Sequence, residues 1–278
     1  MLSHCDKHHF LYPEKPLFEY ADTANLIIDA PAHGAWNMAV DQALLLTAER
    51  NAQVTLRFYR WETATLSLGY FQKVADREQH PGSLHCPVVR RASGGGAIVH
   101  DQELTFSLAF PSANRWSKKN NDLYRSVHGC IVDYLQSVGV GAGLYEKSMN
   151  NGGAAQVKDY ATDRSSNPFL CFQRRTDGDI ILDGQKVGGS AQRRAKNAIL
   201  QHTSLLLRKS PAAQELAGIE DLGGVTLDEA GLIDDLVQRL SKTLLVAFRS
   251  AKLSVEQKEM AEKIVDKTFG NVSWLEKK

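Results

Sequence analysis

The sequence predicts an α+β protein with a mixed, largely antiparallel sheet and flanking helices. Two observations support this prediction. Short stretches that alternate apolar and polar residues, typical of half-buried strands, recur through the first two thirds of the chain, for example at 54–59 and 105–110. The last third instead repeats apolar residues with a helical period. Strands that come first, with helices flanking the sheet and ending the chain, favour α+β over an alternating parallel fold.

Length and composition exclude several functional classes. The chain has 278 residues, of which 43% are hydrophobic and 23% charged, which suits one large domain or a domain with a small appendage. A formal net charge of +1 offers no basic field for nucleic acid. No apolar stretch is long enough to span a membrane, and the first residues lack the apolar segment of a secretory signal. We therefore expect a cytoplasmic protein that binds neither nucleic acid nor membrane.

The cysteines show no metal-ligand spacing. Cys5, Cys86, Cys130 and Cys171 are scattered, and a chain of this length does not need disulfides. Histidines close to Cys5 could hold a metal, but a mobile terminus is the simpler interpretation. We expect free thiols and no metal site.

The first part of the chain predicts strands around one helix. Leu26–Asp29 is a short strand candidate, and the apolar spacing over 35–50 predicts an amphipathic helix. The alternating stretch 54–59 and the stretch 65–70 predict two strands, with Trp61 in the turn between them. We expect these two strands to form an antiparallel pair.

A run of glycines joins the next two predicted strands, 87–91 and 97–100. Gly94–Gly96 follow Ser93, and successive glycines can align backbone N–H groups on an anion or a carbonyl, beside the charge of Arg91 or its neighbour. The segment is not a Walker A loop, because no Gly-Lys-Ser/Thr follows, and not a dinucleotide fingerprint, because a strand follows where a helix is required. A flexible turn explains the glycines equally well.

The middle of the chain contains a helix, a loop and a strand. Asp122 is expected to cap the helix, and Gly139 to close it. Residues 148–168 are polar and lack apolar periodicity, and loops of this length are usually functional or disordered. Residues 198–207 predict a strand that carries His202.

Two helices are expected in the last third. The capping-box pattern Thr226-Leu-Asp-Glu229 precedes an apolar stripe that reaches Phe248, which predicts the first helix. Ser254-Val-Glu-Gln257 repeats the pattern and predicts a second helix that ends at Gly270.

A β-hairpin is predicted around the dipeptide Asp183-Gly184. The apolar run Asp179–Leu182 precedes this dipeptide, which favours a two-residue turn, and Gln185–Val187 returns as the partner strand. Lys186 therefore lies on a rigid hairpin. The glycines that follow, including Gly189, allow another backbone or a ligand to approach the strand closely.

Cys171 precedes Lys186 by fifteen residues, so the two can meet only if residues 173–178 fold back over the hairpin. If they meet, the ammonium favours the thiolate, which is the nucleophilic form of the cysteine. Two simpler interpretations remain open at this point. Between Leu170 and Phe172 the cysteine could be a small buried apolar residue, and the lysine could be a solvated hairpin charge.

Taken together, the motifs resemble the lipoate-protein ligase and octanoyltransferase family. The resemblance covers roughly residues 25–250 and rests on Asn37-Met-Ala-Val-Asp41, Arg57-Phe-Tyr-Arg-Trp61, Leu66-Ser-Leu-Gly-Tyr-Phe-Gln72, Arg90-Arg-Ala-Ser-Gly-Gly-Gly-Ala-Ile-Val-His-Asp101, and Asp183-Gly-Gln-Lys-Val-Gly-Gly-Ser-Ala-Gln192 followed by Gln201-His202. It implies the α+β catalytic domain shared with biotin-protein ligases, a mixed sheet around an acyl tunnel. On this basis we expect a lead-in over 1–24, a catalytic domain over 25–250, and a C-terminal helix and tail over 251–278.

The resemblance is closest to the Bacillus-type octanoyltransferases, which carry a catalytic cysteine in a Cys-Phe context ahead of the lysine. It implies that Cys171 accepts an octanoyl group from acyl carrier protein and passes it to a lysine of a lipoyl domain, with Lys186 keeping the thiol ionised and binding the acyl carbonyl. The acceptor would be the glycine cleavage H protein or a 2-oxoacid dehydrogenase E2, and no cofactor is required. The substrate-binding residues implied are Arg91, Ser93, Gly94, Gly95, Gly96, His100, Gly189, Ser190, Ala191, Gln192 and His202. Of these, Arg91 and His100 would brace the glycine loop, and His202 would be either a general base or a strand histidine with its hydrogen bonds satisfied.

Three alternatives remain open within this resemblance. In an ATP-dependent lipoate-protein ligase, which needs ATP and Mg²⁺, Lys186 would grip the adenylate phosphate and Cys171 would be incidental. An amidotransferase would use the same cysteine to move an octanoyl or lipoyl group between lipoyl domains. A regulator could bind lipoyl domains or acyl groups without turnover, whereas a biotin-type repressor is disfavoured because no helix-turn-helix or basic stripe is found.

Overall fold

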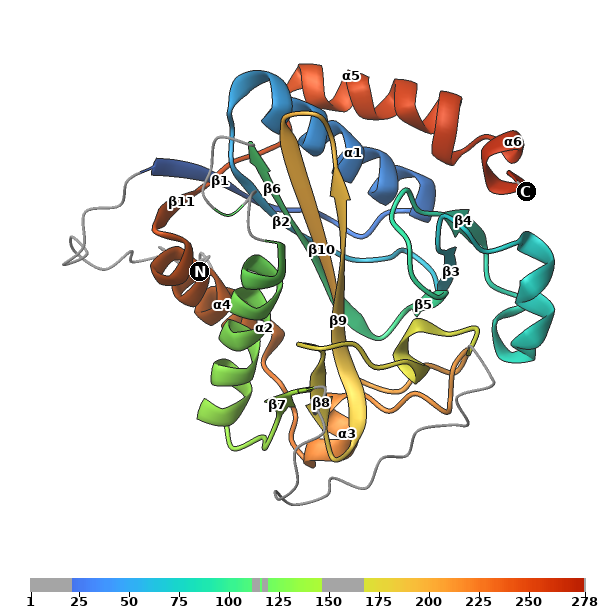
Figure 1. Cartoon of the computed structure of the whole chain (residues 1–278), viewed down its shortest axis with the longest axis vertical. Helices are drawn as coiled ribbons and strands as arrows, with labels where there is room; N and C mark the ends of the chain where they lie inside the picture. The colour runs from blue at the N-terminus through green and yellow to red at the C-terminus, as the bar shows by residue number, and fades with distance from the viewer. Residues whose placement is uncertain (1–21, 112–115, 117–119, 147–167, 278) are drawn as a thin grey trace, which may run out of the picture.

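The computed structural model describes residues 22–111, 116, 120–146 and 168–277. Over these residues the chain forms an eight-stranded sheet (Figure 1). The two pairings at one edge, β11 with β1 and β1 with β2, are parallel, and the others are antiparallel, which confirms the mixed, largely antiparallel sheet. In spatial order the strands are β11 (Val246–Ser250), β1 (Asp22–Ile28), β2 (Thr55–Tyr59), β6 (Glu103–Pro111), β10 (Ala198–Leu206), β9 (Gln185–Arg194), β8 (Ile180–Leu182) and β7 (Gly143–Leu144).

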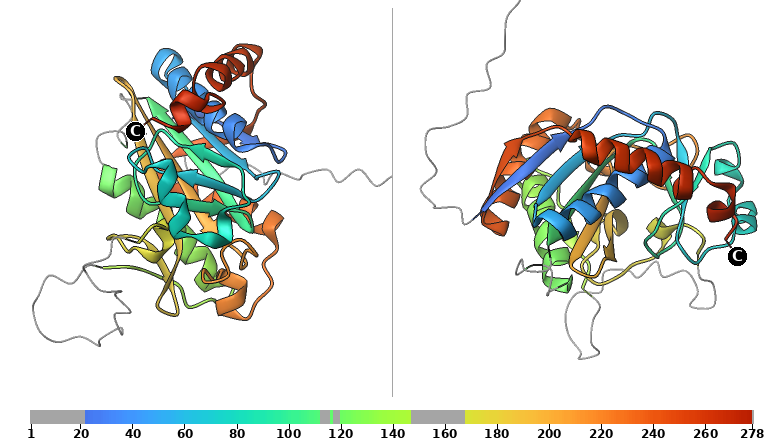
Figure 2. Two further views of the ribbon diagram at one scale, coloured as in Figure 1. Left: turned by 90° about the vertical axis from the view of Figure 1, so that its right-hand side faces the viewer. Right: turned by 90° about the horizontal axis from the view of Figure 1, so that it is seen from above.

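Helices cover both faces of this sheet, as Figures 1 and 2 show from three sides. One face packs on α1 (Gly34–Asn51) and α5 (Val255–Ile264), and the other on α2 (Asn120–Ser137) and α4 (Glu229–Leu244). Each helical layer therefore has its own apolar core against the sheet. The shorter helical elements are α3 (Ile219–Gly223), α6 (Val272–Leu275), the π-helical turn η5 (Val265–Phe269), and the 3₁₀ turns η1 (Val74–Gln79), η2 (Pro81–Ser83) and η4 (Cys171–Gln173).

Strand β6 contributes side chains to both cores, because successive residues of a strand point to opposite faces of the sheet. Leu104, Phe106 and Leu108 belong to the core under α2 and α4, whereas Ala109 belongs to the core under α1 and α5. All nine residues of β6 are buried. The strand predicted over 105–110 is thus a central one, with apolar side chains on one face and several small polar ones on the other.

The predicted antiparallel pairing of 54–59 with 65–70 is wrong. Both edges of β2 are already occupied, by β1 and by β6, so no edge remains for the next strand. That strand, β3 (Thr65–Leu68), instead joins a second sheet of three strands among the described residues. In this small sheet β3 lies between β4 (Val88–Arg90) and β5 (Ile98–His100).

The connection between β2 and β3 is anchored at Trp61. Its backbone forms a bridge with Ala32, and its indole N–H donates to Thr105 Oγ1 at 2.9 Å. These contacts fix the path of the chain where it leaves the large sheet for the small one. The small sheet in turn supports the glycine run, which connects β4 to β5.

Two helices begin at other residues than the sequence predicted. α2 begins at Asn120, which places Asp122 in its first turn and not at the cap. α4 begins at Glu229, with the Asp228 carboxylate accepting from the backbone N–H of Ala230, so Thr226 is not the cap. A carboxylate directly before the first turn satisfies the free N–H groups and so fixes the start.

Other helix predictions are confirmed. The capping box of Ser254 with Gln257 is present, and the last turn ends at Gly270 as expected. Gly139 has a φ of +84°, as a helix-closing glycine should. The helix expected over 35–50 is α1, but it is buried on most sides, between the sheet and α5, and is not amphipathic, contrary to the prediction.

Two neighbouring strands at one edge of the sheet differ from the sequence prediction. The strand predicted at Leu26–Asp29 is β1, which starts earlier, at Asp22. The stripe that reached Phe248 was taken as helical, but α4 ends at Leu244, and Phe248 lies in β11, paired with β1. The open parallel edge of β1 overrides the local helical pattern there. The loop predicted over 148–168 falls almost wholly outside the described residues.

Candidate active site

The β8–β9 hairpin presents Lys186 as predicted. Asp183 and Gly184 both have positive φ, +45° and +71°, as a two-residue turn of this kind requires. Lys186 is the second residue of β9 and is 7% exposed. A Cβ on Gly189 would lie 2.6 Å from Lys186 Cε, so a glycine is needed there for the lysine side chain to reach its place.

Cys171 is held against the glycine run by backbone hydrogen bonds. Its N–H donates to the carbonyl of Ala97 at 2.7 Å, and the Ala97 N–H donates to the carbonyl of Phe169 at 2.9 Å. A Cβ on Gly96 would lie 2.9 Å from the Cys171 nitrogen, so the close approach requires that glycine. Residues 173–178 do fold back, and Lys186 Nζ lies 4.0 Å from Cys171 Sγ.

The glycine run is a braced loop and not a flexible turn. The guanidinium of Arg91 donates to the carbonyls of Gly94 and Gly96, at 2.9 and 2.6 Å, and to the carbonyl of Ser67. Gly95 has a φ of +97°. Burial lowers the pKa of Arg91 to about 10, which leaves the guanidinium charged at neutral pH.

His100 does not brace the loop directly, contrary to the expectation. Its Nε2 lies 2.7 Å from Ser67 Oγ, its Nδ1 lies 2.5 Å from Glu103, and its ring stacks on Trp61. Because Ser67 also accepts from Arg91, His100 reaches the loop only through that serine. Burial lowers the pKa of His100, although the Glu103 carboxylate opposes the shift.

His202 joins the glycine loop to the sheet. Its Nε2 lies 2.8 Å from Ser93 Oγ, and its Nδ1 lies 3.8 Å from the buried carboxylate of Asp41. Asp41 also accepts from Arg57 and Ser107. Burial alone would raise the pKa of Asp41, but the neighbouring His202 and the charge of Arg57 bring it below its usual value. His202 is thus a partnered strand histidine, as the sequence favoured, that also faces the cavity.

Two of the predicted residues of β9, Ser190 and Gln192, belong to a row of hydrogen-bonded polar side chains. Ser190 Oγ lies 2.6 Å from His128 Nε2 on α2 and 2.8 Å from Thr203 Oγ1 on β10. Gln192 Nε2 donates to Gln201 Oε1 at 2.8 Å. This row of polar side chains faces α2.

Two residues that the sequence analysis missed complete the surroundings of Lys186. The Asp179 carboxylate lies 2.8 Å from Lys186 Nζ and accepts from the Tyr124 hydroxyl at 2.5 Å. Tyr124 belongs to α2, 55 positions from Asp179 in the chain. Neither residue carries a local sequence signal, since a single aspartate before a strand and a single tyrosine on a helix are both ordinary.

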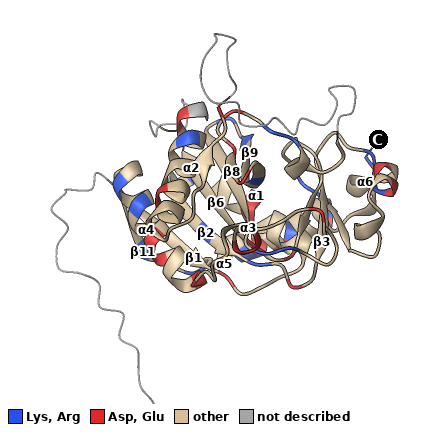
Figure 3. Ribbon diagram, turned by 90° about the horizontal axis from the view of Figure 1, so that it is seen from below, with Lys and Arg blue, Asp and Glu red and all other residues tan. Residues whose placement is uncertain are grey.

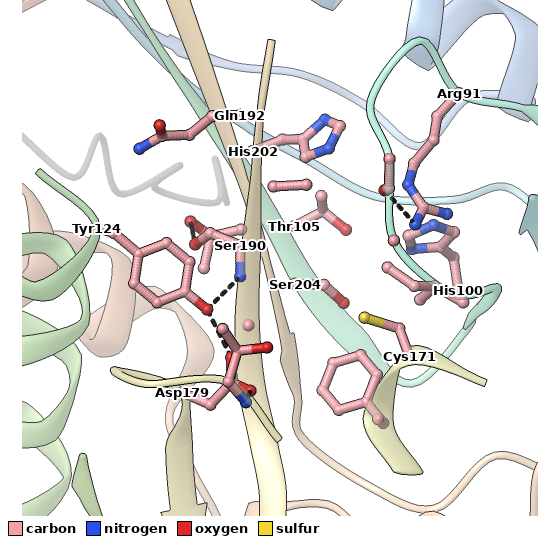
Figure 4. Close-up of a pocket in the computed structure, with 18 of the residues that line it drawn as sticks. Arg91, His100, Thr105, Tyr124, Cys171, Asp179, Ser190, Gln192, His202 and Ser204 are labelled. Carbon is pink, nitrogen blue, oxygen red and sulfur yellow. Dashed lines mark hydrogen bonds between the residues drawn. The ribbon is translucent and has the colours of Figure 1, made fainter. Parts of the chain in front are cut away.

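These side chains line one cavity of about 330 Å³ (Figure 4). All of the predicted site residues line it except Ser93 and Gly96, and Asp179 and Tyr124 line it as well. Met38, Ile98 and Phe172 contribute apolar surface. Figure 4 shows the Cys171 sulfur pointing into this space, toward β9 and β10.

Other site classes find no support in the described part of the chain. No group of three His, Cys, Asp or Glu side chains there could hold a metal ion. No helix among those residues is both long and apolar enough to cross a membrane. Lys and Arg are interspersed with Asp and Glu over α2 and α4, so the side drawn in Figure 3 has no continuous basic face.

A prediction about acid stability follows from His128. The Nδ1–H of this buried side chain donates to the carbonyl of Gly178, its Nε2 lies 2.6 Å from Ser190 Oγ, and burial lowers its pKa from 6.5 to about 4. As the pH falls, this histidine takes up a proton at a higher pH in the unfolded chain than in the folded one. The free energy of unfolding therefore decreases by about 3 kcal/mol between about pH 6.5 and 4. The variant His128→Asn, which can keep the bond to Gly178, should lose about 3 kcal/mol less between pH 7 and 4 in urea unfolding. Equal slopes for His128→Asn and wild type would contradict the prediction.

A second prediction concerns Gly69, which lies beside the glycine loop. A Cβ there would lie 2.0 Å from the carbonyl oxygen of Gly95, so Gly69→Ala must displace the loop. A shift of about 1 Å at such a site costs about 100-fold in rate. If Cys171 accepts an octanoyl group, as the family resemblance implies, we expect that loss in the rate of its acylation. Gly141→Ala, where a Cβ meets nothing within 4 Å, is the matched control and should retain the wild-type rate.

The fold and the position of the cavity define a catalytic domain of the lipoate protein ligase type. In line with this, the model of the lipoyl protein ligase A/B catalytic domain matches residues 33–219. The chain belongs to that family. This confirms the resemblance inferred from the motifs.

Comparisons with individual proteins agree. The chain is 36% identical over 180 residues to the octanoyltransferase LipM of Brevibacillus brevis, an alignment that covers 62% of each protein. It is 30% identical over 260 residues to the octanoyltransferase LipM of Clostridioides difficile, covering 84% of this chain and 92% of the relative. Among solved structures, a bipartite lipoate protein ligase from Thermoplasma acidophilum superposes with a TM-score of 0.68 at 20% identity, covering 91% of this chain and 96% of the other. That likeness supports the fold alone.

Proposed function

We propose that this chain is an octanoyltransferase that moves an octanoyl group from acyl carrier protein to a lysine of a lipoyl domain, through a thioester on Cys171. The similarity to the LipM octanoyltransferases supports the reaction class. The observation that carries the mechanism is the 4.0 Å contact between Lys186 Nζ and Cys171 Sγ inside the cavity. An ammonium beside a thiol favours the thiolate, which is the attacking form.

The transfer proceeds in two balanced steps. In the first, the Cys171 thiolate attacks the carbonyl carbon of the octanoyl thioester, the carrier's C–S bond breaks, and the carrier thiol leaves with the proton that Cys171 gave up. In the second, the amine of the acceptor lysine attacks the Cys171 thioester, an amide forms, and the cysteine thiol is restored. Lys186 stabilises the negative charge that develops on the carbonyl oxygen in both steps.

The first step exchanges one thioester for another at little cost, and the second converts a thioester into the more stable amide, so neither needs ATP or another cofactor. The donor is octanoyl-acyl carrier protein, and the acceptor is a lipoyl domain such as the glycine cleavage H protein or a 2-oxoacid dehydrogenase E2. The glycine loop held by Arg91, and the β9 segment from Gly189 to Gln192, form the walls against which the acyl group would lie.

The test is the mass of the protein after brief mixing with octanoyl-acyl carrier protein in the absence of ATP. We expect one added octanoyl group, located by proteolysis on the peptide that contains Cys171. An acyl adenylate formed only with ATP, Mg²⁺ and lipoate would instead identify a ligase. An adduct formed only from an octanoylated lipoyl domain would identify an amidotransferase.

A further inference from the structure

Lys186 has a charged neighbour as well as Cys171. Its Nζ lies 2.8 Å from Asp179 Oδ2, and both side chains are almost completely removed from solvent, at 7% and 0% residue exposure. A buried ammonium costs much free energy unless a carboxylate accompanies it. Asp179 therefore keeps the lysine charged at the point where the thiol meets it.

Asp179 is itself fixed by two further donors. Oδ1 accepts from the Tyr124 hydroxyl at 2.5 Å, and Oδ2 accepts from the backbone N–H of Thr176 at 2.6 Å. With Lys186 on Oδ2 as well, both oxygens are engaged. The carboxylate is thus held in one orientation and is not placed to act as a proton acceptor for a substrate.

Tyr124 is built into the wall formed by α2. Its ring packs on His128 at a centroid distance of 4.1 Å, and a Cβ on Gly178 would lie 3.1 Å from it. Burial, followed by the charge of Asp179, raises the pKa of Tyr124 far above its usual value. The hydroxyl therefore remains a donor to Asp179 throughout the working pH range.

We propose that Tyr124 and Asp179 are positioning residues for the acyl transfer: they hold the Lys186 ammonium where it can stabilise first the Cys171 thiolate and then the thioester oxyanion. This inference rests on the proposed function. Neither residue touches the reacting atoms, and their effect is transmitted through the lysine. The ammonium stands between the carboxylate and the sulfur, so its position depends on how firmly each side attracts it.

The direction of the expected effect follows from that balance. When the Tyr124 hydroxyl is removed, the Asp179 carboxylate loses a donor and attracts Lys186 more strongly. The ammonium then moves away from Cys171, and the thiolate is less stabilised. Loss of a hydrogen bond to a charged group commonly costs about tenfold or more in an equilibrium.

The experiment measures alkylation of Cys171 by iodoacetamide across pH, together with the rate of octanoylation. For Tyr124→Phe we expect the alkylation midpoint to rise by about one pH unit and octanoylation to slow about tenfold, with the affinity for the donor unchanged. Tyr134→Phe is the matched control, because Tyr134 is buried on the same helix but in the core under α4. It should leave both quantities at wild-type values.

A wild-type alkylation profile for Tyr124→Phe would overturn the inference, whatever the octanoylation assay gives. Asp179→Asn provides the second arm: with the competing carboxylate charge removed, the same balance predicts that the ammonium moves toward Cys171 and the midpoint falls, with a partial return toward the wild-type value in Asp179→Glu. Should Asp179→Asn fail to fold, Tyr124→Phe decides alone, since it removes one oxygen and no charge. Alkylation needs no acyl donor, so it separates failure of this inference from failure of the proposed function.

Discussion

Replacing Cys171 by alanine is expected to reduce octanoyl transfer to below about one ten-thousandth of the wild-type rate, because the chain then lacks the sulfur that would carry the acyl group in the proposed mechanism. The side chain is only partly buried. Removing its sulfur should therefore change the free energy of unfolding by no more than about 1 kcal/mol. The measurement is octanoylation of a lipoyl domain in the presence of octanoyl-acyl carrier protein, beside thermal unfolding of the same sample.

Cys130→Ala is the control that isolates the chemistry of the thiol from the loss of a buried sulfur. Cys130 lies in the core between α2 and α4, with its Sγ 3.3 Å from Thr243 Oγ1, and does not line the cavity. It should retain full transfer, with a modest loss of stability. If Cys171→Ala kept the activity, or kept an ATP-dependent lipoylation, the thioester mechanism would be wrong.

Local chemistry made the hairpin and its lysine predictable. Asp183-Gly184 supplies the turn by itself, so the position of Lys186 could be read without any knowledge of the rest of the chain. The same is true of the Ser254 capping box and of the helix that Gly139 closes. In each case the determining residues lie within a few positions of one another.

Features set by distant partners were not predictable in this way. The strands 54–59 and 65–70 carry the same alternating pattern, and only the occupied edges of β2 send the second into another sheet. Phe248 fits a helical stripe as well as a strand, and the free edge of β1 decides. The apolar period of a segment and its strand propensity do not show which edge of a sheet is free to pair with it.

The site also combines features that local sequence predicts with features that depend on distant partners. Cys171 and Lys186 could be named from the sequence through the family resemblance, but their contact depends on how 173–178 returns. Asp179 and Tyr124 escaped notice because their meeting requires α2 to lie over the hairpin, which no local pattern reveals. The surroundings of Lys186 are therefore visible only once the helix is in place.

Lys186→Met is expected to slow acylation of Cys171 by about 100- to 1,000-fold, which is the usual cost of losing one group that stabilises an oxyanion. It should also lower the free energy of unfolding by about 3–5 kcal/mol, because Asp179 is left as a buried carboxylate without its cation. Rate and stability are measured on the same preparations, by single-turnover acylation and by urea unfolding. The exposed Lys242→Met on α4 should change neither.

The double variant Lys186→Met/Asp179→Asn separates the two effects. Removing the carboxylate's charge together with the lysine's leaves no unpaired buried ion, so most of the lost stability should return. Acylation should remain as slow as in Lys186→Met, because nothing has replaced the ammonium beside the thiol. A double variant that regained rate along with stability would mean that Lys186 supports the fold and not the reaction. Slow acylation in a restored fold would place the ammonium in the chemistry itself.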